Sequence, residues 1–334
     1  MNGAVTLAHG AGGEETRELI DRVFARALEN DYLSEREDAA VIPTGQYAVS
    51  TDGFIVSPLI FSGGDIGKMA VAGSCNDVAM RGAKPQFLAA SFILEEGLNI
   101  DLLEKIVDSF AKELVKNEAK LISADTKVTP RNQAGGGLYI TTTAFGEVKR
   151  EGLGAKHLQE GDLIIASGSC GDHGAAIFAA RGGIEIEGNL KSDCASLWSL
   201  VSRLIDAELP IVCMRDATRG GLAAVANEWA AASDTALTLN EAAILVKNEV
   251  RGVCELLGFE PYSLANEGMM IVAIRGEAAA NDALKIMRSS ELGENAAIIG
   301  CVSGDYRGRV IVKTPHKTAR FLETPSGELL PRIC

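Results

Sequence analysis

Helix and strand patterns alternate along nearly all of the 334 residues, and this alternation constrains the fold more than any other feature. Amphipathic or small-residue stretches predict helices, and short apolar runs predict the strands between them. In the first half the predicted elements are residues 14–30, 46–56 (strand, turn, strand), 66–83, 86–94, 99–117, 119–125 and 137–148. A second set follows from residue 163. Because neither set has a regular βαβαβ count, we predict an α+β fold of two halves with mixed sheets flanked by helices.

A charged, glycine-containing segment separates the two sets and is the best candidate for a domain boundary. Its sequence is KREGLGAKHLQEGD, residues 149–162. Prolines near the end of the chain are typical of an ordered strap or a flexible tail. We therefore divide the chain into an N-terminal segment with a glycine-rich run and a helix (1–35), a first domain (36–150), a second domain (151–313) and a tail (314–334).

The composition argues against two classes of partner. The net charge is −13, whereas nucleic acids and anionic membranes select for clustered Lys and Arg. No apolar run reaches the ~18 residues that span a bilayer, and the first residues lack the basic flank and apolar run of a signal peptide. The seven cysteines are scattered and form no CxxC pair. We therefore expect a cytoplasmic protein that binds neither nucleic acid nor membrane.

The last cysteine differs from the other six. Six cysteines lie among apolar or small residues and are expected to be buried: Cys75, Cys170, Cys194, Cys213, Cys254 and Cys301. Cys334 ends the chain in the sequence PRIC, with no such surroundings. Because a terminal residue is normally mobile, its thiol is either incidental or a group on which a distant site acts.

Familiar nucleotide-binding signatures are absent. The segment SGGDIGKMA resembles a phosphate loop, but Ser62 stands in place of the first glycine and Met69 follows the lysine. The run HGAGG, residues 9–13, is either a floppy turn or a lid whose N–H groups close over phosphates.

Five aspartates in similar settings indicate another kind of nucleotide site. Each stands beside small residues, most at an apparent strand end or helix edge: Asp38, Asp52, Asp77, Asp125 and Asp216. A single such aspartate is most simply a cap or turn residue. Asp77, however, falls within a nearly uncharged predicted helix, where a carboxylate is costly to bury without a cation. Several carboxylates converging on Mg²⁺ would hold ATP without a phosphate loop.

Two further polar residues border apolar segments. Glu267 directly precedes a wholly apolar strand, and Lys127 follows a strand beside a glycine run. Glu267 is either a turn residue or a functional acid, and Lys127 is either a solvated charge or a functional cation.

Taken in order, these motifs resemble the HypE family of hydrogenase maturation proteins. The segments that carry the resemblance are AHGAGG, EDAA, STDGF, FSGGDIGK, CNDVAM, FILEEGL, ADTKV, GDHG, RDATRGGL, ANEGMM and the terminal PRIC, from about His9 to Cys334. The wider superfamily includes aminoimidazole ribonucleotide synthetase, selenophosphate synthetase and thiamine-monophosphate kinase. One departure is Ala124, where other members have glycine.

The resemblance implies a PurM-like fold and a homodimer whose N-terminal sheets pair into a barrel-like interface. It implies that Asp38, Asp77 and Asp216 ligate Mg²⁺. It further implies that ATP or its metals contact Asp52, Asn76, Asp125 and Thr126. The implied reaction begins when the carbamoyltransferase HypF loads a carbamoyl group onto Cys334. ATP-dependent dehydration then yields a thiocyanate, whose cyano group passes to iron on the HypC–HypD scaffold for the [NiFe] centre.

Such a dehydration needs a base and charge stabilisation. Glu267 is the candidate base, and Lys127 would orient it or stabilise charge on the oxygen or phosphate, although their roles are exchangeable. Two alternatives remain. One is a selenophosphate-synthetase-like or other small-molecule ATP-dependent phosphotransferase, and the other is a non-catalytic nucleotide-binding maturation scaffold.

Overall fold

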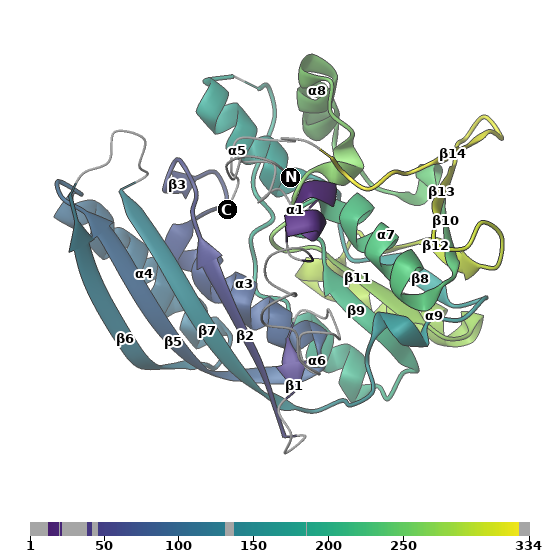
Figure 1. The fold of residues 1–334 in the computed structure, drawn as a ribbon, viewed down its shortest axis with the longest axis horizontal. Coiled ribbons are helices and arrows are strands. Elements are labelled where there is room, and N and C mark those ends of the chain that lie inside the picture. The colour runs from purple at the N-terminus through teal and green to yellow at the C-terminus, as the bar shows by residue number, and fades with distance from the viewer. Residues whose placement is uncertain are drawn as a thin grey trace.

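Two mixed β-sheets, one from each half of the chain, organise the molecule (Figure 1). The computed structural model describes residues 13–19, 21, 39–41, 46–130, 137–184 and 186–326. Helices flank both sheets, so the predicted α+β class with mixed sheets is confirmed.

The first sheet has five strands in the order β1-β2-β7-β5-β6. Their bounds are β1 Ala40–Val41, β2 Tyr47–Phe54, β7 Leu138–Val148, β5 Ala83–Glu95 and β6 Lys120–Thr129. Among the described strands of this sheet, only β5 and β6 pair in parallel, and helix α4 (Ile100–Lys116) connects them. The Asn99 side chain caps α4 by accepting a hydrogen bond from the Leu102 N–H. A short hairpin, β3 (Ile60–Phe61) and β4 (Gly64–Asp65), and the short helix α1 (Glu14–Leu19) complete this half.

Helix α3 (Ile66–Met80) lies against this sheet and also contacts the second half. Its sequence is rich in small residues, and 13 of its 15 residues are buried. Gly73 shows how close the packing is, since a Cβ there would lie 2.7 Å from the Phe54 ring. The predicted small-residue helix is therefore confirmed, and it is held between the two halves.

The structure corrects two local predictions in this sheet. Residues 46–56 were expected to turn at Thr51–Gly53, but β2 runs straight through and pairs with Thr141–Thr143 of β7. The predicted strand 119–125 extends to Thr129, because the β-branched residues after Asp125 continue the pairing with β5. Asp125 and Lys127 therefore lie within a strand rather than in a loop.

Strand β6 forms an exposed edge of the first sheet. Its first nine residues are exposed, including the apolar side chains of Leu121, Ile122 and Val128. Such an edge offers backbone groups and apolar surface to another strand.

The second sheet has seven strands in the order β14-β13-β10-β12-β8-β11-β9. Their bounds are β14 Ala319–Phe321, β13 Val310–Lys313, β10 Ala236–Asn240, β12 Ala297–Ser303, β8 Leu163–Ala166, β11 Met270–Ile274 and β9 Ile211–Asp216. The helices of this half are α5 Asp172–Gly182, α6 Trp198–Asp206, α7 Gly221–Ser233, α8 Asn248–Leu257 and α9 Glu277–Arg288.

Strand β11 is buried on both faces of this sheet. Ile271 and Ala273 belong to the hydrophobic cluster that includes α7, whereas Met270 and Val272 belong to the cluster of α6 and α9. The sequence DCASLWSLVSRLID, residues 193–206, predicts a helix from Asp193, but α6 begins only at Trp198, so that predicted start is wrong. The preceding segment has no regular secondary structure, because its backbone and the Asp193 side chain form hydrogen bonds with neighbouring loops.

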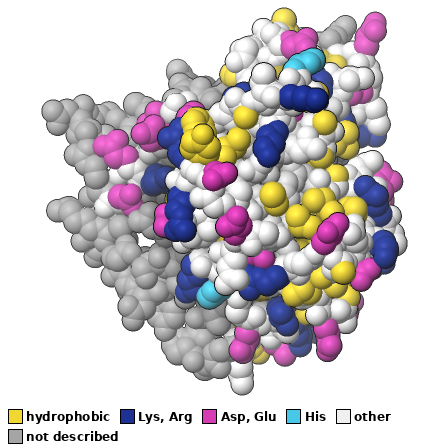
Figure 2. All heavy atoms as spheres, turned by 90° about the vertical axis from the view of Figure 1, so that its right-hand side faces the viewer, with side chains coloured by type: hydrophobic (Ala, Val, Ile, Leu, Met, Phe, Trp, Pro, Cys, Tyr) yellow, Lys and Arg dark blue, Asp and Glu magenta, His cyan; other side chains and the backbone are white. Residues whose placement is uncertain are grey.

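The outer face of the second half carries charges of both signs (Figure 2). Ion pairs join Arg309 to Glu323 and Arg320 to Glu260. Among the helices that the structure describes, none has the length and hydropathy to cross a bilayer.

The cysteines follow the sequence prediction where the structure describes them. Five are buried, and Cys301 is partly buried. Burial raises the pKa of the thiols of Cys75, Cys170 and Cys194, with neighbouring carboxylates adding to the rise. These thiols are therefore poor nucleophiles at neutral pH.

Candidate active site

A cavity of about 230 Å³ lies where the two halves meet. Strand β2, helix α3, the end of β9 and the turn before β11 supply its walls. The lining residues are Ser50, Thr51, Asp52, Phe54, Gly73, Asp77, Arg215, Thr218, Arg219 and Glu267. Three residues predicted from sequence, Asp52, Asp77 and Glu267, therefore share one cavity.

Asp77 projects from α3 toward β2. Its Oδ2 accepts a hydrogen bond of 2.5 Å from the Ser50 hydroxyl. The side chain is half-buried on a helix whose only other charged residue is Lys68. A fixed carboxylate is thus placed at the wall of the cavity.

Asp216 ends strand β9 and is buried next to the cavity. Its Oδ2 has no hydrogen-bond partner within the described part of the chain. Burial raises the pKa of Asp216 to about 6, and repulsion from Asp52 adds to the rise while Arg215 opposes it. A buried carboxylate oxygen without a donor is a group that a cation would satisfy.

Glu267 is also buried, with 3% of its surface exposed. Burial raises the pKa of Glu267 well above its ordinary value, and repulsion from Asp216, Asp193 and Asp52 adds to this rise. Arg219 acts in the opposite direction. Three carboxylates thus repel the Glu267 carboxylate, so a cation bound among them would lower the pKa of Glu267.

The turn that carries Glu267 is held by Asp193, a residue that the sequence analysis missed. The Asp193 carboxylate accepts hydrogen bonds from the backbone N–H groups of Glu267 and Gly268, both 3.0 Å, and from the Asn266 amide, 2.8 Å. A Cβ on Gly268 would lie only 1.9 Å from the Asp193 carbonyl oxygen. Asp193 stands between small residues, as the other aspartates do. It was not singled out, because the segment was predicted to be a helix.

Two arginines at the cavity were also missed, although they stand in the RDATRGG segment. Arg219 lies 3.9 Å from Asp52, and Arg215 lies 3.2 Å from Glu228. Both side chains line the cavity with Thr218. Guanidinium groups at this position suit the oxygens of a phosphate chain.

Asp125, Thr126 and Lys127 lie elsewhere, on the exposed edge strand β6. Lys127 forms an ion pair of 2.9 Å with Asp125. Hydrogen bonds from Lys127 and the Thr126 backbone lower the pKa of Asp125. Strands β7 and β5 separate β6 from β2, a lateral distance of about 14 Å. Within one chain the structure therefore does not bring Lys127 to the cavity.

Asn76, which the resemblance implies as a contact of the nucleotide, makes hydrogen bonds between the two halves of the molecule. Its amide donates to the Ala195 carbonyl, 3.1 Å, and accepts from the Leu197 N–H, 2.8 Å. With 1% of its surface exposed, Asn76 ties α3 to the segment before α6. Asp38 and Cys334 lie outside the described residues.

Carboxylates are the type of ligand that magnesium prefers, but the described residues bring few of them together. No three His, Cys, Asp or Glu side chains in the described ranges are arranged to hold an ion. Magnesium, however, usually takes only one or two protein carboxylates together with phosphate oxygens and waters. Half-buried Asp77 and the partnerless oxygen of Asp216 fit such a partial site.

Comparison with known proteins places the chain in a family. The family model for the N-terminal domain of AIR synthase related proteins matches residues 36–148. The model for their C-terminal domain matches residues 159–313. Carbamoyl dehydratase HypE of Azotobacter vinelandii is 43% identical, covering 100% of this chain and 98% of that protein. This chain belongs to the HypE family. HypE of Escherichia coli K12 is 41% identical, covering 99% of both chains.

Solved structures agree with this membership. A HypE in complex with ATP has a TM-score of 0.83 and 40% identity, covering 99% of this chain and 100% of that one. The match in a HypE–HypF complex has a TM-score of 0.87 and 39% identity, covering 92% of this chain and 99% of that one. Thiamine monophosphate kinase of Aquifex aeolicus, with a TM-score of 0.66 and 18% identity, shares the fold.

Proposed function

We propose that this chain is an ATP-dependent carbamoyl dehydratase whose substrate is its own C-terminal Cys334. HypF would load the carbamoyl group, and the product thiocyanate would supply cyanide ligands to [NiFe] hydrogenase through the HypC–HypD scaffold. The observation that carries the proposal is the cavity that gathers Asp52, Asp77 and Glu267 beside the partnerless oxygen of Asp216. Family membership and the ATP and HypF complexes of relatives support it.

The residues around the cavity suit ATP with its magnesium. Asp77 and Asp216 would hold Mg²⁺ together with Asp38, while Asp52 lies nearby with Arg219. Arg215 and Arg219 would bind phosphate oxygens. When bound, magnesium would neutralise charge on the phosphates.

ATP is needed because the amide oxygen is a poor leaving group. Transfer of the γ-phosphoryl group to the oxygen of S–C(=O)–NH₂ would let that oxygen leave as phosphate. The nitrogen would lose two protons, giving S–C≡N, ADP and inorganic phosphate. The oxygen leaves in the phosphate, which also takes up one of the two protons, and the other proton passes to solvent.

Glu267 would accept one of these protons. Its burial excludes water from the carboxylate, and the Asp193-held turn fixes the Glu267 backbone. A base is most effective when its pKa lies near the working pH, and the raised pKa moves Glu267 in that direction.

A second copy of the chain would complete the site. The exposed apolar edge of β6 is suited to pairing with another sheet, as in the homodimer expected from sequence. Such pairing would bring Asp125, Thr126 and Lys127 of one chain toward the cavity of the other. This resolves the separation of Lys127 from Glu267 within one chain.

Mass spectrometry of the C-terminal peptide tests the function. Incubation with HypF, carbamoyl phosphate and ATP should add a carbamoyl mass and then remove one water. The variant Glu267→Gln should stop at the carbamoyl stage, and Cys334→Ser should gain no mass. Turnover of a free small molecule by Cys334→Ser would support the phosphotransferase alternative, and a persistent disulfide at Cys334 would support the scaffold.

A further inference from the structure

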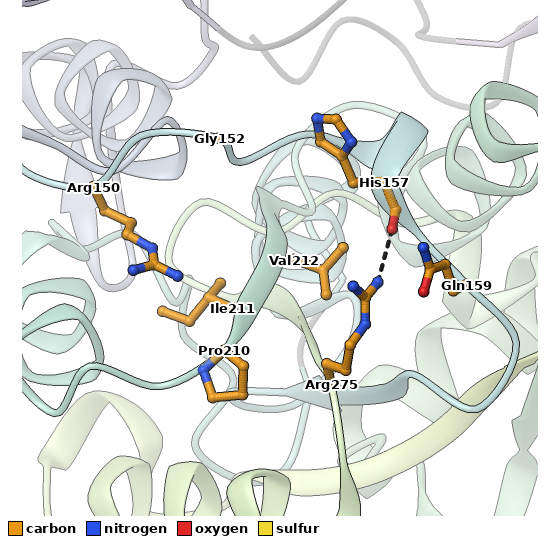
Figure 3. Close-up of a pocket in the computed structure, with 8 residues that line it drawn as sticks. All are labelled: Arg150, Gly152, His157, Gln159, Pro210, Ile211, Val212 and Arg275. Carbon is orange, nitrogen blue, oxygen red and sulfur yellow. Dashed lines mark hydrogen bonds between the residues drawn. The ribbon is translucent and has the colours of Figure 1, made fainter.

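A second cavity, of about 400 Å³, lies at the far ends of the strands that lead to the active site (Figure 3). Strand β9 runs from Ile211 at this cavity to Asp216 at the other, about 17 Å away. Strand β11 likewise begins after Glu267 and ends before Arg275, which lines the second cavity. The two cavities are therefore separate sites.

Cationic side chains stand on both sides of this cavity. In Figure 3, Arg150 lies on one side of the pair Ile211 and Val212. Arg275 lies on the other side of this pair, with His157 nearby. The floor between the two arginines is apolar, and Pro210 continues it. In a chain of net charge −13, two arginines around one apolar floor are unexpected.

Arg275 is already fixed in place. Its Nε and Nη2 donate to the two oxygens of buried Asp162, 2.9 and 3.0 Å, and Nη2 also donates to the His157 carbonyl, 2.9 Å. Asp162 thus balances the Arg275 charge and holds its guanidinium plane in one orientation. A ligand would meet this group without having to order it.

Arg150 has no such partner. Its Nε is buried and has no hydrogen-bond acceptor among the residues that the structure describes. The adjacent Lys149, by contrast, pairs with Glu147 at 2.8 Å. Figure 3 shows the Arg150 guanidinium pointing toward Ile211, so its outer N–H groups face the cavity. No ion pair with a carboxylate of the described residues neutralises this cation, and an anionic ligand would supply the acceptor that it lacks.

We propose that this cavity binds a small organic anion, whose carboxylate or phosphate group lies at Arg150 and whose apolar body lies on Ile211 and Val212. The volume is within the range of small-molecule pockets, about 300–1,000 Å³. Nothing in this proposal depends on the dehydratase activity, because the cavity shares no lining residue with the active site.

Binding of two simple probes to the full-length protein tests the proposal. Benzoate offers a carboxylate and phenyl phosphate a phosphate, each on the same apolar ring. Both would be titrated by calorimetry in the presence of saturating magnesium and a non-hydrolysable ATP analogue, so that the active site is filled. The probe with the lower dissociation constant identifies the anionic group.

The variant Arg150→Gln is compared with the control Lys149→Gln, which removes the same charge one residue away. Loss of a charge-assisted hydrogen bond should weaken probe binding at least about tenfold in Arg150→Gln. Lys149→Gln should change it less than about twofold. Arg150→Gln should fold normally, since the Arg150 side chain has no hydrogen-bond partner in the described chain.

Three results would overturn the proposal. The first is that neither probe binds the unaltered protein at about 10 mM. The second is an equal loss in both variants, which would indicate general electrostatics. The third is unchanged binding in Arg150→Gln, which would place the probe elsewhere.

Discussion

Mixing two inactive variants should restore activity if Lys127 acts across a dimer. The variants are Lys127→Ala and Glu267→Gln, each expected to be inactive alone. The reasoning is geometric, because β6 lies about 14 Å across the sheet from β2. A lysine side chain extends only about 6 Å from its Cα. Lys127 therefore cannot serve the cavity of its own chain.

In a mixed dimer, one site would combine both substitutions and the other would have neither. Random exchange makes about half of the dimers mixed, and one of their two sites is intact. The mixture should therefore show about one quarter of the activity of the unaltered protein. If Lys127 acted within its own chain, no mixed site would be intact.

The assay is conversion of the Cys334 thiocarbamate to thiocyanate, followed by mass spectrometry. Native mass spectrometry of the same sample would confirm that mixed dimers form. Mixed dimers with no activity above that of the separate variants would refute the argument from strand spacing.

Two further changes test the carboxylates around Glu267. Raised from 3.8 to about 6 by burial, the pKa of Asp216 makes the folded state bind more protons than the unfolded state between these values. Without nucleotide, this group should therefore lower stability by about 2 kcal/mol as pH rises from 4 to 7, and urea unfolding of Asp216→Asn should lack this loss. The change Asp193→Asn places an NH₂ group against the N–H donors of the Glu267 turn, so turnover should fall by about tenfold or more with ATP affinity nearly unchanged. Single-turnover kinetics and nucleotide titration separate the two effects, and equal losses in both would contradict a positioning role.

Local patterns were sufficient to predict most of the fold. Helices α3 and α4 follow from the composition and spacing of nearby residues. The errors arose where long-range pairing decides the structure. Thr51–Gly53 resembles a turn by composition, yet pairing with β7 keeps it extended.

The site was predictable to the same degree. Asp77 was singled out because a carboxylate is costly to bury in a nearly uncharged helix. In the structure, Asp77 lines the cavity. Asp193 was missed because its role depends on a turn more than seventy residues away. The hydrogen bonds of Asn76 to residues 195–197 could not be predicted, because they join segments more than a hundred residues apart.

Helix α3 also limits how the molecule can move. It is buried against the first sheet, and Asn76 fastens it to the backbone ahead of α6 in the second half. Rotation of one half away from the other would break those hydrogen bonds and expose the buried side chains of α3. The wall that α3 gives to the cavity is accordingly a rigid frame, because the same helix is fastened to both halves of the molecule.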